Sequence, residues 1–254
     1  MNKAIPSITF SMDGQEIRTE QGQTILQAAQ QNGIYIPSLC ALYADQNDNL
    51  HADIIPGTCR VCTVKVNGRP MAACTTPAAQ DLAVENDTQE LNELRKSIIE
   101  MLFVEGNHFC PACEKSGTCD LQALAYRYKM LLPRFHYAFS PKEVNADPPN
   151  LLFDGNRCIL CKRCVDAIYT DTGIPLFAFT HRGNKSTITV DAELTKDISD
   201  ALAQKAMDIC PVGAIIRKGR GFDTPIGKRK YDHSPIGSDP GHSPVDKEED
   251  GRTT

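Results

Sequence analysis

Eleven cysteines are spread over this chain of 254 residues, and eight of them stand in three tight groups. The groups are Cys59 and Cys62; Cys110, Cys113 and Cys119; and Cys158, Cys161 and Cys164. Cysteines two residues apart usually share a metal instead of bonding to each other. The odd count, and an amino-terminus without the apolar core of a secretory signal, also argue against a disulfide framework. We therefore expect a cytoplasmic protein of small domains, each stabilised partly by its own metal centre.

The overall composition narrows the possible functions. Hydrophobic residues make up 41% of the chain, which is too apolar for a wholly disordered protein. The formal net charge of -5 excludes a broadly basic surface for nucleic acid. No apolar run approaches the roughly 18 residues that a membrane span requires. No G-x-G-x-x-G or Walker A sequence is present either, so we expect the substrate chemistry to lie on another protein.

The third group forms a C-x2-C-x2-C run, and a distant cysteine followed by proline completes it. The run places three thiolates on one short loop, and the Cys-Pro pair supplies a fourth ligand. A structural zinc site is the alternative, but zinc sites generally pair two knuckles of two ligands each. We therefore predict a [4Fe–4S] cluster held by Cys158, Cys161, Cys164 and Cys210.

Two single cysteines flank the first group, Cys40 before it and Cys74 after it. The sequence around them predicts a hairpin over residues 8–18, a helix over 23–31 and a hairpin over 61–74. This small α+β unit suits a [2Fe–2S] ferredoxin domain, although 18 residues separate the first two cysteines where plant-type ferredoxins have four. A zinc ribbon is the alternative. We predict a [2Fe–2S] cluster held by Cys40, Cys59, Cys62 and Cys74.

The middle group has three cysteines where a cubane cluster needs four ligands, and no unassigned cysteine remains. His108 stands two residues before Cys110 and can supply the missing ligand. The remaining histidines lack such a context and are interpreted as ordinary residues: His51, His136, His181, His233 and His242. We predict a second [4Fe–4S] cluster held by His108, Cys110, Cys113 and Cys119. A neutral imidazole in place of a thiolate should raise its reduction potential.

The periodicity of the remaining sequence predicts the domain organisation. Apolar residues from Leu91 to Phe103 follow one helix face and lead directly to the middle group. A second helix is expected from Asp120, a strand over 186–190 and a helix over 200–208. The expected α+β protein has a [2Fe–2S] ferredoxin-like domain (1–80), a helical [4Fe–4S] domain with one histidine and three cysteine ligands, followed by a linker (81–150), a small [4Fe–4S] ferredoxin-like domain (151–218) and an extended tail (219–254).

Basic residues gather at the start of the tail, within 14 positions of an otherwise acidic protein: Arg217, Lys218, Arg220, Lys228, Arg229 and Lys230. With Phe222, Ile226 and Tyr231 among them, they predict a segment that docks on an acidic partner surface. A solvated, disordered tail is the alternative, and we expect it after Tyr231. Truncation after Lys218 should then spare the clusters and weaken assembly, whereas truncation after Tyr231 should do little.

Taken together, these motifs resemble a known family. The resemblance is to the iron–sulfur subunit of the diaphorase module in NAD-reducing [NiFe] hydrogenases, and it covers the segments GNHFCPACEKSGTC (106–119), RCILCKRC (157–164), CPVG (210–213) and PIGKRKY (225–231). The chain is also similar to the amino-terminal part of the large iron–sulfur subunit of complex I, and to that region of some [FeFe] hydrogenases and NAD-dependent formate dehydrogenases. Its H-x-C spacing at His108 agrees with the hydrogenase branch, whereas complex I relatives usually have H-x3-C. The loop from Ala41 to Thr58 is longer than usual.

The resemblance implies a β-grasp fold for the first domain and an electron relay as the function. Hydrogen is oxidised at the nickel–iron centre of hydrogenase small and large subunits, and electrons pass through three clusters to FMN on a subunit that reduces NAD+. This chain then works in a hetero-oligomer and has no active site of its own, since FMN, NAD and the Ni-Fe centre lie on partners. The alternatives are an equivalent relay in a formate dehydrogenase or complex I-like assembly, and a zinc-stabilised interaction module.

Overall fold

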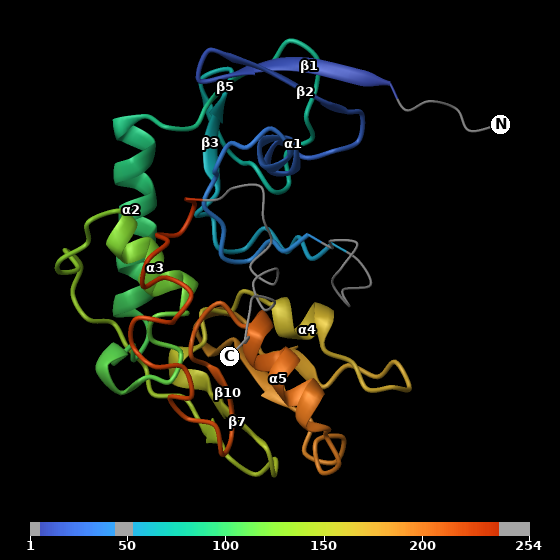
Figure 1. The fold of residues 1–254 in the computed structure, drawn as a ribbon, viewed down its shortest axis with the longest axis vertical. Coiled ribbons are helices and arrows are strands. Elements are labelled where there is room, and N and C mark those ends of the chain that lie inside the picture. The colour runs from blue at the N-terminus through green and yellow to red at the C-terminus, as the bar shows by residue number, and fades with distance from the viewer. Residues whose placement is uncertain (1–5, 44–52, 239–254) are drawn as a thin grey trace, which may run out of the picture.

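The computed structural model describes residues 6–43 and 53–238. Its amino-terminal part is a five-stranded mixed sheet with one helix beside it, α1 (Ile25–Gln31) (Figure 1). The strands, in spatial order, are β2 (Gln15–Glu20), β1 (Ser7–Met12), β5 (Ala83–Glu85), β3 (Thr63–Val66) and β4 (Arg69–Ala72). β1 and β5 are parallel, and the other neighbours are antiparallel. The expected ferredoxin-like architecture is confirmed, and its sheet extends past residue 80 through β5.

Two short turns set the hairpins of this sheet. Both central residues of each turn have left-handed backbone angles: Asp13 (φ 49°) with Gly14 (φ 80°), and Asn67 (φ 48°) with Gly68 (φ 79°). Two successive left-handed residues match the twist of the flanking strands, and they require glycine or a small polar residue. Both hairpins predicted from these dipeptides are therefore present.

Two helices frame the middle cysteine group. α2 (Gln89–Val104) is capped by Thr88, whose side chain accepts a hydrogen bond from the Leu91 backbone. α3 (Asp120–Arg127) packs against α2 and buries Leu121 and Leu124 completely. Between the helices the chain makes a 3-10 turn at Cys110–Ala112. Both helices match the sequence prediction.

The third region joins two small sheets and two helices. Its elements are β6 (Val144–Asn145), β7 (Leu151–Asp154), α4 (Arg163–Ala167), β8 (Phe177–Thr180), β9 (Thr187–Val190), α5 (Asp200–Ile209) and β10 (Ile215–Arg217), with 3-10 turns at Gly155–Arg157 and Gly183–Lys185. β7 pairs with both β6 and β10, and β8 pairs with β9. Because β10 returns to β7, the two ends of this region meet and enclose the cysteine loop between them.

Two hydrophobic cores fill the molecule, and the four cysteines of the first predicted site lie where the cores meet. Cys62 and Cys74 belong to the core under the five-stranded sheet. Cys40 and Cys59 belong to the second core, which also contains Cys119, Cys161, Cys164 and Cys210. The three parts of the chain are therefore packed together, with six cysteines inside the larger core.

The carboxyl-terminal residues fold back on their own chain as far as residue 238, where the sequence predicted an extended tail. We call residues 225–238 the C-terminal clasp; it runs beside α3 (Figure 1). Lys230 Nζ lies 3.1 Å from Asp120 Oδ1, and Arg229 Nη2 lies 2.7 Å from Asp232 Oδ1. Ile236 packs on the second core, so the segment after Tyr231 is packed as far as residue 238.

Most of the basic residues in this region are engaged within the chain, and their docking on an acidic partner surface stays a prediction. Arg217 pairs with Asp200, Arg220 pairs with Asp223, and Lys218 donates to the carbonyl of Pro148. Phe222 and Ile226 are 62% and 83% exposed. Their role as apolar anchors for a partner stays a prediction.

Several features of the sequence lie outside the described residues. They are residues 44–52 of the Ala41–Thr58 loop, which include His51, and the segment from 239 to 254, which includes His242. Over the described ranges, no helix combines the length and apolarity needed to cross a membrane.

Candidate metal centres

The first candidate site brings the thiols of four cysteines together between the two cores. Hydrogen-bond contacts link Cys59 to Cys40, Cys40 to Cys74, and Cys74 to Cys62. All four residues are buried. Arg60 turns the loop between Cys59 and Cys62 with a left-handed backbone (φ 61°), and Cys74 follows Ala73 just after the end of β4. Contacts with Cys59 and Cys74 lower the pKa of the Cys40 thiol, whereas contact with Cys40 and burial raise the pKa of Cys59.

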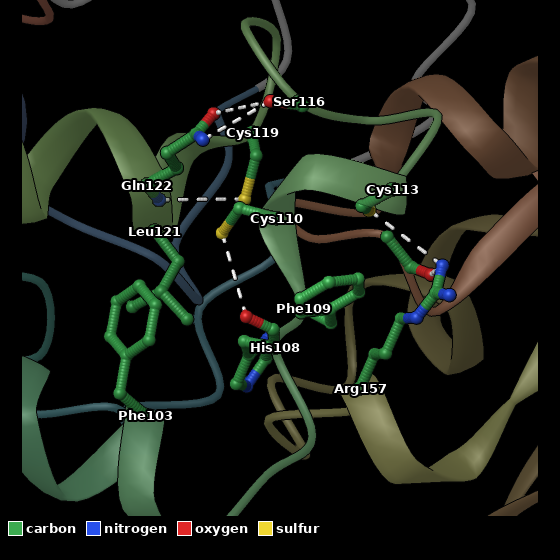
Figure 2. A pocket seen from close by; sticks show the side chains of 11 residues that line it. Phe103, His108, Phe109, Cys110, Cys113, Ser116, Cys119, Leu121, Gln122 and Arg157 are labelled. Carbon is green, nitrogen blue, oxygen red and sulfur yellow. Dashed lines mark hydrogen bonds between the residues drawn. The ribbon is translucent and has the colours of Figure 1, made fainter.

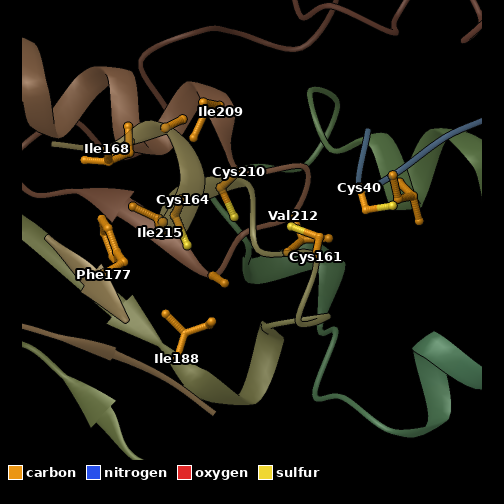
Figure 3. Packing of buried hydrophobic residues seen from close by; sticks show 14 of the residues in the cluster. Cys40, Cys161, Cys164, Ile168, Phe177, Ile188, Ile209, Cys210, Val212 and Ile215 are labelled. Atoms are coloured by element: carbon orange, nitrogen blue, oxygen red, sulfur yellow. The ribbon is translucent and has the colours of Figure 1, made fainter. Parts of the chain in front are cut away.

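The third candidate site surrounds a cavity with the four predicted cysteines. Cys158, Cys161, Cys164 and Cys210 line it together with apolar side chains that include Phe153, Ile188 and Val212. Two residues between the cysteines, Leu160 (φ 55°) and Lys162 (φ 65°), have left-handed backbones that curl the loop around the cavity. In Figure 3, Cys164, Cys210, Cys161 and Cys40 follow one another from left to right across the second core.

The middle candidate site lies between the ends of α2 and α3 (Figure 2). His108, Cys110, Cys113 and Cys119 line one cavity there. Cys110 begins the 3-10 turn, Cys113 follows it, and Cys119 is the residue before α3, where its sulfur accepts a hydrogen bond from the Gln122 backbone at 3.4 Å. The structure therefore gathers the four side chains named from the sequence, and ligation by them stays a prediction.

His108 has a nitrogen that is buried without a partner. Its Nε2 forms no hydrogen bond with any described residue. Burial lowers the pKa of the ring to about 4, so the imidazole is neutral, and a hydrogen bond to the Leu102 backbone partly opposes this shift. The ring packs 5.3 Å from the Phe103 ring, centroid to centroid. A neutral imidazole with one nitrogen held and the other unsatisfied is the form that binds metals.

The donor sets fit iron–sulfur clusters. Burial raises the pKa of the Cys158 thiol to about 11 and that of Cys119 to about 12, so these thiols need a bound cation to become thiolates. Among the described residues, no three His, Cys, Asp or Glu side chains converge on a position for one metal ion. The four side chains of the middle set line one cavity, and those of the third set line another.

The sequence interpretation missed residues that join the middle site to the third. Arg157, which precedes Cys158, donates to the Cys113 sulfur at 3.6 Å. Asp120 N donates to the Pro211 carbonyl at 2.9 Å, and a Cβ on Gly213 would overlap the Cys113 sulfur. The available signal was that Arg157, Pro211 and Gly213 flank cysteines of the third group. Residues that flank the cysteines of the third site therefore contact residues of the middle site directly.

Replacing Gly213 with alanine is expected to displace Cys113 and lower the iron content of the middle site. The added Cβ would press on the Cys113 sulfur, and overpacking of this kind costs about 1–3 kcal/mol. Iron and sulfide analysis of the purified protein measures the loss. Gly221→Ala is the matched control, since its Cβ would meet only Glu114 Cγ at 3.6 Å. Equal iron in both variants would show that the site tolerates the methyl group.

Three family models match the chain in succession. A 2Fe-2S iron-sulfur cluster binding domain matches residues 6–89. The NADH-ubiquinone oxidoreductase-G iron-sulfur binding region matches residues 95–133, and the ferredoxin-like domain of NADH-quinone oxidoreductase subunit 3 matches residues 149–216. Each match contains one of the three cysteine sets, so the chain carries a 2Fe-2S domain followed by further iron–sulfur regions.

Individual relatives agree with these matches. The chain is 44% identical over 227 residues to the gamma subunit of the NAD-reducing hydrogenase HoxS of Cupriavidus necator. The aligned region covers 89% of this chain and 94% of the relative. It is 32% identical over 225 residues to the mitochondrial 78 kDa subunit of NADH-ubiquinone oxidoreductase from Candida albicans. That match covers 87% of this chain but only 30% of the longer relative.

A solved structure gives the same result. The fold matches a chain in the crystal structure of an NAD+-reducing [NiFe]-hydrogenase in the H2-reduced state, with a TM-score of 0.80 and 40% sequence identity. The match covers 92% of this chain and 97% of that chain. With three cysteine sites in matching domains and similarity along nearly its whole length, the chain belongs to the family of the iron–sulfur gamma subunit of NAD-reducing hydrogenases.

Proposed function

We propose that this chain is the electron-transfer subunit of an NAD-reducing hydrogenase. It relays electrons through three iron–sulfur clusters between a [NiFe] hydrogenase and an FMN-containing subunit that reduces NAD+. The observation that carries the proposal is the continuous core in which Cys40, Cys119 and Cys161, one from each site, are packed together. Sites fixed on one packed scaffold keep constant separations, which a relay needs.

The proposed ligand sets are the three groups brought together in the structure. A [2Fe–2S] cluster is assigned to Cys40, Cys59, Cys62 and Cys74, one [4Fe–4S] cluster to His108, Cys110, Cys113 and Cys119, and another to Cys158, Cys161, Cys164 and Cys210. Such clusters, when bound, accept and release single electrons. The chain's own side chains hold the sulfurs, donate hydrogen bonds to them, as Arg157 does to Cys113, and exclude water with apolar neighbours such as Val212.

The substrate chemistry is assigned to the partners. In this proposal the chain has no active site of its own, the flavin subunit binds FMN and NAD, and the hydrogenase small and large subunits hold the Ni-Fe centre. We place the complex in the cytoplasm, where eleven unpaired cysteines stay reduced. Residues 1–80, 81–150 and 151–218 are proposed as one domain per cluster, with β5 (Ala83–Glu85) added to the first of them, followed by the segment 219–254.

Metal analysis combined with identification of co-purifying subunits tests this function. Iron and acid-labile sulfide in near-equal amounts, together with a flavin subunit and [NiFe] hydrogenase subunits, are the expected result. Zinc without sulfide would instead indicate an interaction module. If the co-purifying subunits instead belong to a formate dehydrogenase or to complex I, the chain is an electron relay of that assembly and not of a hydrogenase.

A His108→Cys variant is expected to keep the middle cluster and lower its reduction potential, because it adds a negatively charged thiolate in place of neutral imidazole. For one electron, about 59 mV corresponds to a tenfold change in the equilibrium constant, so a redox titration followed by electron paramagnetic resonance (EPR) will resolve it. The control is His136→Cys, at an exposed histidine away from the cavity. An unchanged midpoint in His108→Cys would contradict ligation by His108.

A further inference from the structure

A buried ion pair joins the three candidate sites at one point. Asp120 opens α3 directly after Cys119 of the middle site, and Arg163 opens α4 directly before Cys164 of the third. Arg163 Nη1 lies 3.5 Å from Asp120 Oδ2, with the two side chains only 8% and 15% exposed. Arg163 Nη2 also donates at 3.0 Å to the carbonyl of Ala41, the residue after Cys40 of the first site. One guanidinium thus contacts segments from all three sites.

The C-terminal clasp fixes the carboxylate of this pair. Tyr231 donates its hydroxyl proton to Asp120 Oδ1 at 2.6 Å, and Lys230 Nζ lies 3.1 Å from the same oxygen. The Tyr231 backbone N–H donates to the Gly117 carbonyl at 2.9 Å. Arg163 is held less completely, because its Nε is buried without a hydrogen-bond partner in the described part of the chain. The two charges are therefore fixed 3.5 Å apart, on segments that belong to different sites.

The position of the two charges gives them opposite effects on an added electron. A positive charge stabilises the reduced, more negative state of a nearby redox centre, and a negative charge destabilises it. In a protein interior with an effective dielectric constant of about 20, a unit charge roughly 10 Å away changes a one-electron equilibrium by about tenfold. Arg163 lies in the loop of the third site, whereas Asp120 adjoins the last cysteine of the middle site.

We propose that the Asp120–Arg163 pair sets the reduction potentials of its neighbouring clusters in opposite senses. Arg163 raises the potential of the third cluster and, through its contact at Ala41, that of the first. Asp120 lowers the potential of the middle cluster. The inference rests on the proposed function, because it presupposes clusters at these sites. Both residues act through the cluster surroundings and are positioning residues.

The test compares four variants of the full chain, purified with its partner subunits. Arg163→Gln removes the positive charge, Arg163→Lys keeps it, and Asp120→Asn removes the negative charge. Arg217→Gln is the matched control, because Arg217 pairs at 2.7 Å with Asp200 at the start of α5, and neither residue lines the cavity of the middle or the third site. Iron content is measured first, and each cluster's midpoint potential is then titrated by EPR.

We expect Arg163→Gln to lower the midpoint of the third cluster, and Asp120→Asn to raise that of the middle cluster. Each shift should correspond to about a tenfold change in the equilibrium constant, which is about 59 mV. Arg163→Lys and Arg217→Gln should stay near wild type. A purely structural role would not produce shifts of opposite sign.

Unchanged midpoints, or shifts of the same sign, in iron-loaded variants would overturn the role of the pair and leave the relay standing. If the Arg163→Gln variant loses the third cluster, the midpoint potentials of the Asp120→Asn and Arg163→Lys variants decide the test. A raised midpoint of the middle cluster in Asp120→Asn, together with an unchanged midpoint of the third cluster in Arg163→Lys, supports the proposal. Any other combination refutes it. A wild-type chain without iron would instead overturn the proposed function itself.

Discussion

Replacing Cys161 with serine is expected to remove or convert the third cluster and to stop electron flow from hydrogen to NAD+. Cys161 is 7% exposed and lines the cavity with Cys158, Cys164 and Cys210. A serine hydroxyl is a harder ligand than a soft thiolate and is poorly suited to iron–sulfur clusters. Because Cys161 lies in the core shared with Cys40 and Cys119, its loss breaks the proposed relay in its interior.

The measurement combines iron analysis, low-temperature EPR and two assays of the complex. Iron should fall by up to the content of one [4Fe–4S] cluster, and NAD+ reduction should fall to background, while dye-linked hydrogen oxidation by the partner survives. Cys59→Ser is the matched variant, since it should remove the [2Fe–2S] signal and leave both [4Fe–4S] signals. Wild-type iron content and EPR spectra in Cys161→Ser would refute the assignment.

Much of the fold could be predicted from the sequence where local signals are strong. Asp13-Gly14 and Asn67-Gly68 define hairpins because their backbones must be left-handed, and the long apolar stripe of α2 admits only a helix. Strands of two or three residues, such as β6 and β10, contain too few positions to show a period. β5 was missed for the same reason: with three residues, it forms only through pairing with β1 and β3.

The candidate sites, like the fold, could be predicted from the sequence only in part. The cysteine sets follow from spacing and counting, and the structure places their members together. The connections between sites do not follow from spacing. Arg163 and Ala41 are 122 residues apart, and Lys230 and Asp120 are 110 apart, so only tertiary packing brings them into contact. The contact of Lys230 with Asp120 was not foreseen because the two residues lie so far apart in the sequence.

Truncation after Lys218 is expected to destabilise the middle site, in contrast to the sequence-based expectation that all clusters survive it. The deletion removes Lys230 and Tyr231, two of the three side chains that bind the Asp120 carboxylate, and leaves Arg163 alone at 3.5 Å. Breaking a buried charged network by removing one side costs roughly 3–5 kcal/mol. The loop from Ser116 to Asp120, which contains Cys119, also loses its bonds to Arg229 and Tyr231.

Chemical unfolding and iron analysis of the truncated chain measure this effect. The free energy of unfolding should fall by roughly 3–5 kcal/mol, and iron loss should be confined to the middle cluster. Truncation after Ser238 is the control, since it keeps the whole clasp. Truncation after Tyr231 should now also be harmful, because Asp232 holds Arg229 at 2.7 Å and Arg127 donates to the Ile236 carbonyl at 2.9 Å.

A Tyr231→Phe variant separates the clasp's contact with Asp120 from the loss of the tail as a whole. It removes one hydroxyl donor to a charged acceptor, which is worth about 1.5–3 kcal/mol, and leaves Lys230 and the backbone bond to Gly117 in place. A graded series is the expected result, with Tyr231→Phe between full length and the Lys218 truncation. If the shortest chain retains all its iron and unfolds like full-length protein, the clasp contributes nothing to the middle site. Weakened assembly in that same chain would return the segment to a role in partner docking.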